Sequence, residues 1–169
     1  RTMTVSEFDA QMHKMIMRYP EQVSLVQMNF LDTHDVPRFL SYCVGDRRRL
    51  RLAYFYLFMG YGVPSVFYGD EYYIEGETEN AYRSPMPWGS EDNCYDILRE
   101  YAQIRREHSA IRNGTYRTVL CQDEKGLYLF LRENEQEKIL IALNNSDEEQ
   151  EISDKAWRIP PMQGDIRIL

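Results

Sequence analysis

The 169-residue sequence lacks several features, and each absence excludes a class of protein. No apolar run approaches the roughly 20 residues needed to cross a membrane, so we expect no membrane partner. Basic residues do not dominate: 20 lysines and arginines stand against 27 acidic residues, which gives a formal net charge of −7. Because nucleic-acid phosphates demand a basic face, this acidic balance argues against a nucleic-acid partner.

Cysteine is also scarce. Cys43, Cys94 and Cys121 are far apart, odd in number and free of any C-x-x-C spacing, so the sequence suggests neither a zinc site nor a disulfide framework. We interpret them as reduced thiols of a cytoplasmic protein. No pattern in the sequence indicates a metal or another cofactor.

The most informative stretch of the sequence is Val23–Arg38, where an apolar run is followed by ionisable residues. Apolar side chains fall on both alternating faces of residues 23–31, which favours a buried parallel strand. Asp32, His34 and Asp35 follow directly. Ionisable groups at the carboxyl end of a parallel strand are where α/β enzymes place their chemistry, so this loop is the first candidate site.

The segments around this loop predict a βαβ unit. Thr4 and Glu7 have the spacing of a capping box and predict a helix that Pro20 ends. Residues 47–59 read as a second helix and Val63–Tyr68 as a short strand. A crossover helix between two strands makes them parallel neighbours.

Gly69–Asn93 shows no periodicity, and a loop of that length in a compact enzyme is usually a binding loop. Its aromatic residues offer flat apolar faces on which a ligand can stack, and its charged residues offer hydrogen-bond partners; they are Tyr72, Tyr73, Tyr82 and Trp88, and Asp70, Glu71, Glu75, Glu77, Glu79 and Arg83. For Trp88 a second interpretation stays open, in which the indole only packs the loop against its neighbours.

The last third of the sequence predicts an all-β unit. A helix from Asp92 or Asn93 to about His108 precedes it, and Gly114 is placed to stop the chain after that helix. The apolar period then becomes two, with hairpin turns at residues 123–126 and 134–137. We expect a small antiparallel sheet or sandwich of about five to seven strands.

Two stretches carry a family resemblance. FLDTHDVPRFLS (residues 30–41) resembles the fourth conserved region of the α-amylase superfamily of retaining glycoside hydrolases, particularly its neopullulanase and cyclomaltodextrinase branch. GVPSVFYGDEYYIEGETENAYRSPMPW (residues 62–88) is similar to that family's segment from the last barrel strand into the substrate-binding loop. Glu79, Asn80 and Tyr82 depart from the family's usual Asp, Pro and Asn, which leaves the preference for outer glucose units open.

The resemblance implies an α/β plus all-β fold. A complete (β/α)₈ TIM barrel needs about 250 residues, so we expect residues 1–112 to be its C-terminal part, with the last two strands and helices. Residues 113–169 would form a C-terminal antiparallel β-sandwich domain. Because the chain starts at Arg1 and the family's nucleophile and acid/base lie on earlier strands, we expect the C-terminal portion of a longer enzyme, inactive alone and prone to self-association.

The resemblance also assigns roles. Asp35 corresponds to the family's third carboxylate, a catalytic residue that stabilises the transition state at the sugar before the cleaved bond. His34 and Arg83 correspond to substrate-binding positions. For Arg38 we favour a structural ion pair over substrate contact. The implied partner is an α-glucan such as starch, maltodextrin, pullulan or cyclodextrin, with no cofactor.

Three other interpretations compete with this hypothesis. His-Asp pairs mark metal phosphohydrolases, but His13 and His108 lack ligand spacing, so we expect no metal. A non-catalytic member of the same fold, kept for carbohydrate binding or as a scaffold, is the leading alternative. A stand-alone interaction module is the third.

Overall fold

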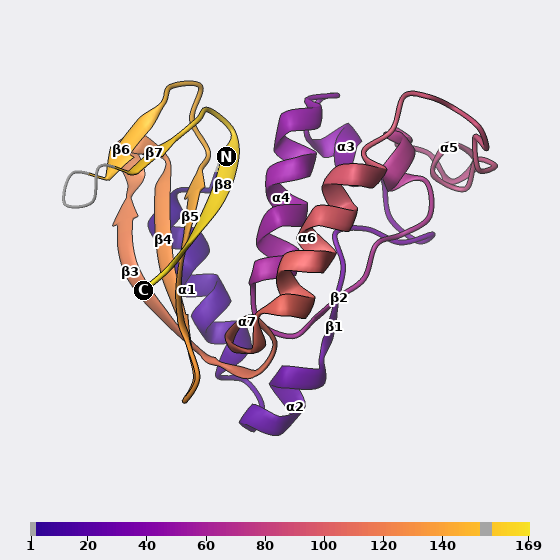
Figure 1. Ribbon diagram of the computed structural model, residues 1–169. Helices are drawn as coiled ribbons and strands as arrows, with labels where there is room; N and C mark the ends of the chain where they lie inside the picture. The colour runs from indigo at the N-terminus through magenta and orange to yellow at the C-terminus, as the bar shows by residue number, and fades with distance from the viewer. Residues whose placement is uncertain (1–2, 153–156) are drawn as a thin grey trace.

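A computed structural model describes residues 3–152 and 157–169. Its helices are α1 (Val5–Ile16), α2 (Glu21–Val26), α3 (Phe39–Tyr42), α4 (Arg47–Met59), α5 (Glu79–Tyr82), α6 (Tyr95–Glu107) and α7 (Ser109–Asn113), with 3₁₀ turns η1 (Asp70–Tyr72) and η2 (Asp123–Lys125). Its strands are β1 (Met28–Asn29), β2 (Val63–Pro64), β3 (Thr115–Gln122), β4 (Leu127–Glu133), β5 (Lys138–Asn144), β6 (Gln150–Ile152), β7 (Trp157–Ile159) and β8 (Gln163–Ile168). Figure 1 shows the strands β3–β8 with α1 behind them on one side, α4 and α6 in the middle, and the α5 region at the far side.

The first helix begins as the sequence predicts. The Glu7 backbone N–H donates to Thr4 Oγ1 (3.2 Å), and the Thr4 N–H donates to Glu7 Oε2 (3.0 Å). Two backbone donors that the helix cannot satisfy internally are thereby paired, so the capping box is confirmed.

The prediction of one buried strand over residues 23–31 was wrong. Glu21–Val26 form helix α2, with Pro20 at its N-cap, and the strand β1 is reduced to Met28 and Asn29. The side chains of Val26 and Met28 are 71% and 59% exposed. The physical reason is strand pairing, because the only described neighbour of β1 is β2. The other edge of β1 lacks backbone hydrogen-bond partners, and its side chains lack the apolar cover that a buried strand needs.

The βαβ unit itself is confirmed. Met28 pairs with Val63 and Asn29 with Pro64 in parallel register, and α4 is the crossover between them. Asp46 caps α4 by accepting the Arg48 N–H at 2.9 Å, and Gly60 ends it. The second strand is shorter than predicted, at two residues in place of Val63–Tyr68.

The predicted helix up to His108 is present as α6, which begins after Cys94. Asn93 still helps to start it, because its Oδ1 accepts the N–H of Tyr95 at 3.2 Å. His108 then breaks the run, and the short helix α7, which the sequence did not predict separately, follows before Gly114.

The β-strand region has the predicted hairpins. The sheet order is β3-β4-β5-β8, all antiparallel, with β6 and β7 paired separately. Successive side chains of β4 point to opposite faces of the sheet. Tyr128 and Phe130 join the core with the helices, whereas Leu127 and Leu129 pack with Trp157 of β7. Both faces of the sheet are therefore covered.

The core is continuous between the helices and the sheet. It joins Phe55 and Phe58 of α4 to Phe130 of β4 and Ile141 of β5. At Gly164 of β8 a Cβ would lie within 2.2 Å of Phe55 ring atoms, so only glycine permits this close approach of helix and strand. A domain boundary at residues 112/113 stays a prediction.

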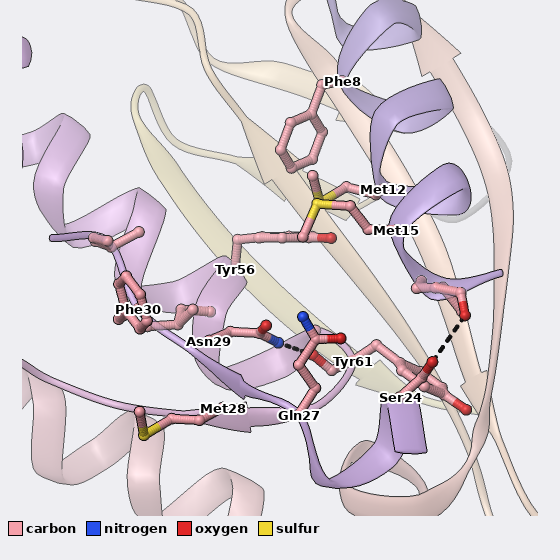
Figure 2. A pocket seen from close by; sticks show the side chains of 14 residues that line it. Phe8, Met12, Met15, Ser24, Gln27, Met28, Asn29, Phe30, Tyr56 and Tyr61 are labelled. Atoms are coloured by element: carbon pink, nitrogen blue, oxygen red, sulfur yellow. Dashed lines mark hydrogen bonds between the residues drawn. The ribbon is translucent and has the colours of Figure 1, made fainter. Parts of the chain in front are cut away.

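A groove of about 450 Å³ lies between α1, β1 and the end of α4. Figure 2 shows Phe8, Met12 and Met15 of α1 on one side and Tyr56 and Tyr61 on the other. Its lining is largely apolar, and the self-association expected of the isolated chain stays a prediction.

Candidate functional site

The loop after β1 is held closed at its base. Asp32 is buried, and its Oδ2 accepts the N–H of Phe39 at the start of α3 (2.6 Å). Within the loop Thr33 Oγ1 accepts the Asp35 N–H (3.2 Å). The side chains of His34 and Asp35 project from this loop and are 64% and 67% exposed. A buried carboxylate thus fixes a short loop that presents two polar groups to solvent.

The three predicted site residues come together. His34 Nε2 lies 3.3 Å from Asp35 Oδ2, and Arg83 Nη2 lies 3.3 Å from Asp35 Oδ1. Arg83 Nε also donates to the His34 carbonyl oxygen (2.9 Å). Arg83 comes from the loop after β2, 48 residues beyond Asp35, so the fold builds this His34–Asp35–Arg83 constellation from two separate segments.

The arrangement orients a carboxylate toward solvent. Each Asp35 oxygen has one nitrogen neighbour, which leaves further lone pairs free to accept hydrogen bonds from a ligand. Glu79 Oε1 accepts from Arg83 Nη1 (2.7 Å) and holds the guanidinium from its other side. Such a site suits a polyhydroxylated ligand, because hydroxyl groups donate to carboxylates and accept from imidazole or guanidinium groups.

Arg38 lies beneath the constellation and is fully buried. Its Nη1 donates to Asp70 Oδ1 (3.3 Å) and to the Tyr68 carbonyl oxygen (2.6 Å), and its Nε donates to the Tyr82 carbonyl oxygen (3.0 Å). The interpretation of Arg38 as a structural ion pair is confirmed. Its position excludes direct substrate contact, because no part of the side chain reaches the surface.

Asp70 sits in an unusual electrostatic environment. Burial, followed by the nearby charge of Asp32, raises its pKa to about 8, against the hydrogen bond from Tyr54 and the charge of Arg38, which lower it. Tyr54 donates a short hydrogen bond to Asp70 Oδ2, and burial beside two carboxylates raises the pKa of its phenol. The raised pKa means that Asp70 holds its proton to higher pH than an exposed aspartate does.

This pKa shift predicts a pH dependence of stability. A carboxyl whose folded-state pKa is raised stabilises the fold fully below its unfolded pKa of about 4 and loses that contribution as pH rises to about 8. Asp70→Asn removes the titration. We therefore expect the stability of the wild type relative to Asp70→Asn to decline between pH 4 and 8 in urea denaturation. A difference that is constant with pH would contradict the assignment; Asp92→Asn, at an exposed carboxylate, is the control.

Two residues of the predicted binding loop are not available to a ligand. Asp70 and Tyr73 are 2% and 6% exposed, so their prediction as ligand contacts of the binding loop was wrong. The left-handed Gly69 and the 3₁₀ turn η1 fold them inward, where Asp70 meets Arg38 and the Tyr73 hydroxyl accepts from Arg51 Nε (2.8 Å). Trp88, in contrast, is 79% exposed, so among the described residues its indole is not used to pack the loop.

Sequence reasoning missed the buried cluster of Asp32, Tyr54 and Asp70 with Arg38. Only one signal was present: Asp32 directly follows the apolar run, and Asp70 follows the next one. Tyr54 sits in an apolar stretch of α4 and gives no sign of polar contacts. Pairing of these groups is a tertiary property.

Residues 3–152 and 157–169 contain no group of three or more His, Cys, Asp or Glu side chains placed to hold a metal ion. None of the helices in those ranges combines the length and apolar character that a membrane crossing requires.

The sequence is similar to one family of known proteins. Residues 1–118 match the sequence family described as "Alpha amylase, catalytic domain". A cyclomaltodextrinase of Bacillus sp. is 32% identical over 82% of this chain and 25% of its own, and neopullulanase 2 of Thermoactinomyces vulgaris is 31% identical over 86% and 25%. The chain thus spans about a quarter of the length of these curated relatives.

Solved structures of glycoside hydrolases are also similar to this chain. A cyclomaltodextrinase structure superposes with a TM-score of 0.79 at 30% identity, over 88% of this chain and 26% of that one. A cyclic α-maltosyl-(1→6)-maltose hydrolase from Arthrobacter globiformis reaches 0.90 at 23% identity, over 99% and 40%, which shows the shared fold.

Proposed function

Because the chain belongs to the α-amylase family, we propose that it is the C-terminal part of a retaining α-glucan hydrolase or transglycosylase. The observation that supports this most is the His34–Asp35–Arg83 constellation at the carboxyl end of β1. In this proposal residues 1–112 close a TIM barrel with the preceding part of the parent protein. Residues 113–169 form its β-sandwich domain, in which β6 and β7 cover the outer face of the larger sheet.

Asp35 is proposed as the transition-state stabiliser. Cleavage of a glycosidic bond places positive charge on the sugar ring in an oxocarbenium-like transition state. Hydrogen bonds from the ring hydroxyls to a fixed carboxylate strengthen as that charge develops, so the carboxylate binds the transition state more tightly than the ground state. His34 and Arg83 hold Asp35 in place and offer the sugar one imidazole and one guanidinium contact.

The covalent chemistry is assigned to groups outside this chain. A retaining glycosidase needs a nucleophilic carboxylate and a carboxylic acid about 5 Å apart. Asp35 is proposed as neither, and the buried Asp32 and Asp70 cannot reach a substrate. In the proposal both groups are supplied by earlier strands of the barrel.

We therefore expect the 169-residue chain to hydrolyse no α-glucan. Purified chain would be incubated with cyclodextrin, pullulan and maltooligosaccharides, and reducing ends would be measured over a day. The parent protein should cleave at least one of them with retention of the anomeric configuration, which NMR of the first product detects. Turnover by the chain alone would contradict the assignment of the nucleophile.

The upstream sequence of the parent separates this proposal from a non-catalytic member of the same fold. An aspartate and a glutamate at the ends of two earlier barrel strands support the enzyme, and their absence would leave a carbohydrate-binding or scaffold protein. Exposed Trp88 suits either outcome, because a flat aromatic face stacks on sugar rings whether or not cleavage follows.

A further inference from the structure

We infer that Arg38 is a positioning residue, whose buried guanidinium holds Arg83 and the His34–Asp35 loop in their relative positions. The inference rests on the proposed function for its significance, since the constellation it holds is the proposed sugar site. Arg38 would act only through these groups, because its side chain has no exposed surface.

One side chain connects the segments that carry the constellation. Arg38 follows Asp35 by three residues, and its backbone N–H donates to the Gly76 carbonyl oxygen (2.9 Å). Its Nε donates to the carbonyl oxygen of Tyr82 (3.0 Å), which directly precedes Arg83. The guanidinium therefore fixes the residue next to Arg83 from beneath, while Arg83 reaches over to Asp35 and the His34 carbonyl oxygen.

The segment after β2 is held by the same group. Arg38 Nη1 donates to the Tyr68 carbonyl oxygen (2.6 Å), and the guanidinium carbon lies 4.3 Å from the Phe67 ring centre. The Phe67 ring in turn lies 6.5 Å from the His34 ring. Gly69, with φ +91°, turns the chain so that the Tyr68 carbonyl and the Asp70 carboxyl both face Arg38.

Stability alone does not explain this cluster. Asp32 Oδ1 and Arg38 Nη2 are buried and have no hydrogen-bond partner among the described residues. Half-satisfied buried polar groups cost free energy, and well-packed apolar side chains often replace a buried ion pair without loss. A planar guanidinium, in contrast, donates to two loop carbonyls and one carboxyl at once. It can therefore fix several segments of the chain relative to one another.

The test compares Arg38→Lys with Arg132→Lys in the 169-residue chain. Both arginines are fully buried and donate to backbone carbonyls, but Arg132 lies in β4 and contacts none of the constellation. A lysine keeps the charge and loses the fork geometry. The readout is the hydrogen-exchange rate of Arg83 Nε–H by NMR, because that N–H donates its hydrogen bond to the His34 carbonyl oxygen.

Losing charge-assisted hydrogen bonds corresponds to roughly a tenfold to hundredfold change in a local opening equilibrium. We expect exchange of Arg83 Nε–H to accelerate by at least tenfold in Arg38→Lys and by less than twofold in Arg132→Lys. Equal exchange rates in the two variants would overturn the inference. Should Arg38→Lys not fold, Phe67→Leu decides: it removes the nearer of the two aromatic rings that stack on the guanidinium, those of Phe67 and Tyr68, and an unchanged Arg83 signal overturns the inference.

This readout requires neither substrate nor turnover. An inactive parent protein would therefore defeat the proposed function and leave the Arg83 result standing. In an active parent Arg38→Lys should lower kcat at least tenfold in the folded fraction, whereas Arg132→Lys should lower the melting temperature and leave kcat near the wild-type value.

Discussion

Asp35→Asn in the parent enzyme is expected to lower kcat by roughly two to three orders of magnitude, with a smaller effect on KM. Charge-assisted hydrogen bonds are about twice as strong as neutral ones. The loss of a transition-state contact costs about 3 to 4 kcal/mol, which corresponds to that fall in rate. Because the amide has nearly the shape of the carboxylate and the side chain is 67% exposed, the fold should be kept.

The measurement pairs kinetics with thermal unfolding on one preparation. A purely structural Asp35 would lower the melting temperature while the folded fraction kept wild-type turnover. Asp92→Asn is the matched control, since Asp92 is also exposed and paired with an arginine, Arg47 (2.6 Å), but is placed outside the constellation. A kcat within threefold of wild type for Asp35→Asn, with Asp92→Asn unchanged, would remove Asp35 from the catalytic machinery.

The sequence predicted best where a local rule sufficed. The capping box at Thr4, the apolar crossover helix after Asp46 and the period-two strands near Leu127 are each determined by neighbours in sequence, and each is present. The strand over residues 23–31 failed for the opposite reason. A strand depends on partners distant in sequence, and β1 has one described neighbour, so its apolar pattern alone did not determine its length or burial.

In the candidate site, too, some features could be predicted from the sequence and others could not. The resemblance named His34, Asp35 and Arg83, and the fold brings them together although 48 residues separate the last two. It did not show that Asp70 turns inward to a buried arginine, because that turn depends on the left-handed Gly69 and on contacts with Arg38 and Tyr54, which are distant in sequence. Side chains that carry charge in sequence can thus be core residues in structure.

A second buried arginine, Arg132 of β4, holds the helices to the sheet. Its Nε donates to the Thr115 carbonyl oxygen (3.1 Å), and Nη2 donates to that of Gly114 (3.0 Å). Nη1 donates to the Met59 carbonyl oxygen (3.2 Å) and to that of Gly60, at the end of α4. The last carbonyls of a helix lack internal partners and carry partial negative charge, so a cation there satisfies both needs.

Arg132→Met is expected to destabilise the chain by about 3 to 5 kcal/mol, a large share of the stability of an ordinary domain. Methionine fills much of the volume but donates no hydrogen bond, so buried carbonyl groups are left unsatisfied, at about 1 to 3 kcal/mol each. Burial, followed by the charge of Arg105, lowers the pKa of Arg132 to about 10, so the wild-type cation persists at neutral pH.

Urea denaturation followed by circular dichroism measures this loss, with Arg117→Met as the control. Arg117 lies on the neighbouring strand β3 and is exposed, and a surface substitution of this kind usually changes stability by less than about 0.5 kcal/mol. Both variants remove one positive charge from the same sheet, so net charge cannot explain a difference between them. If Arg132→Met lost less than about 1 kcal/mol, the carbonyls of Met59 and Gly114 would have to find other donors, and Arg132 would not be what joins the end of α4 to the sheet.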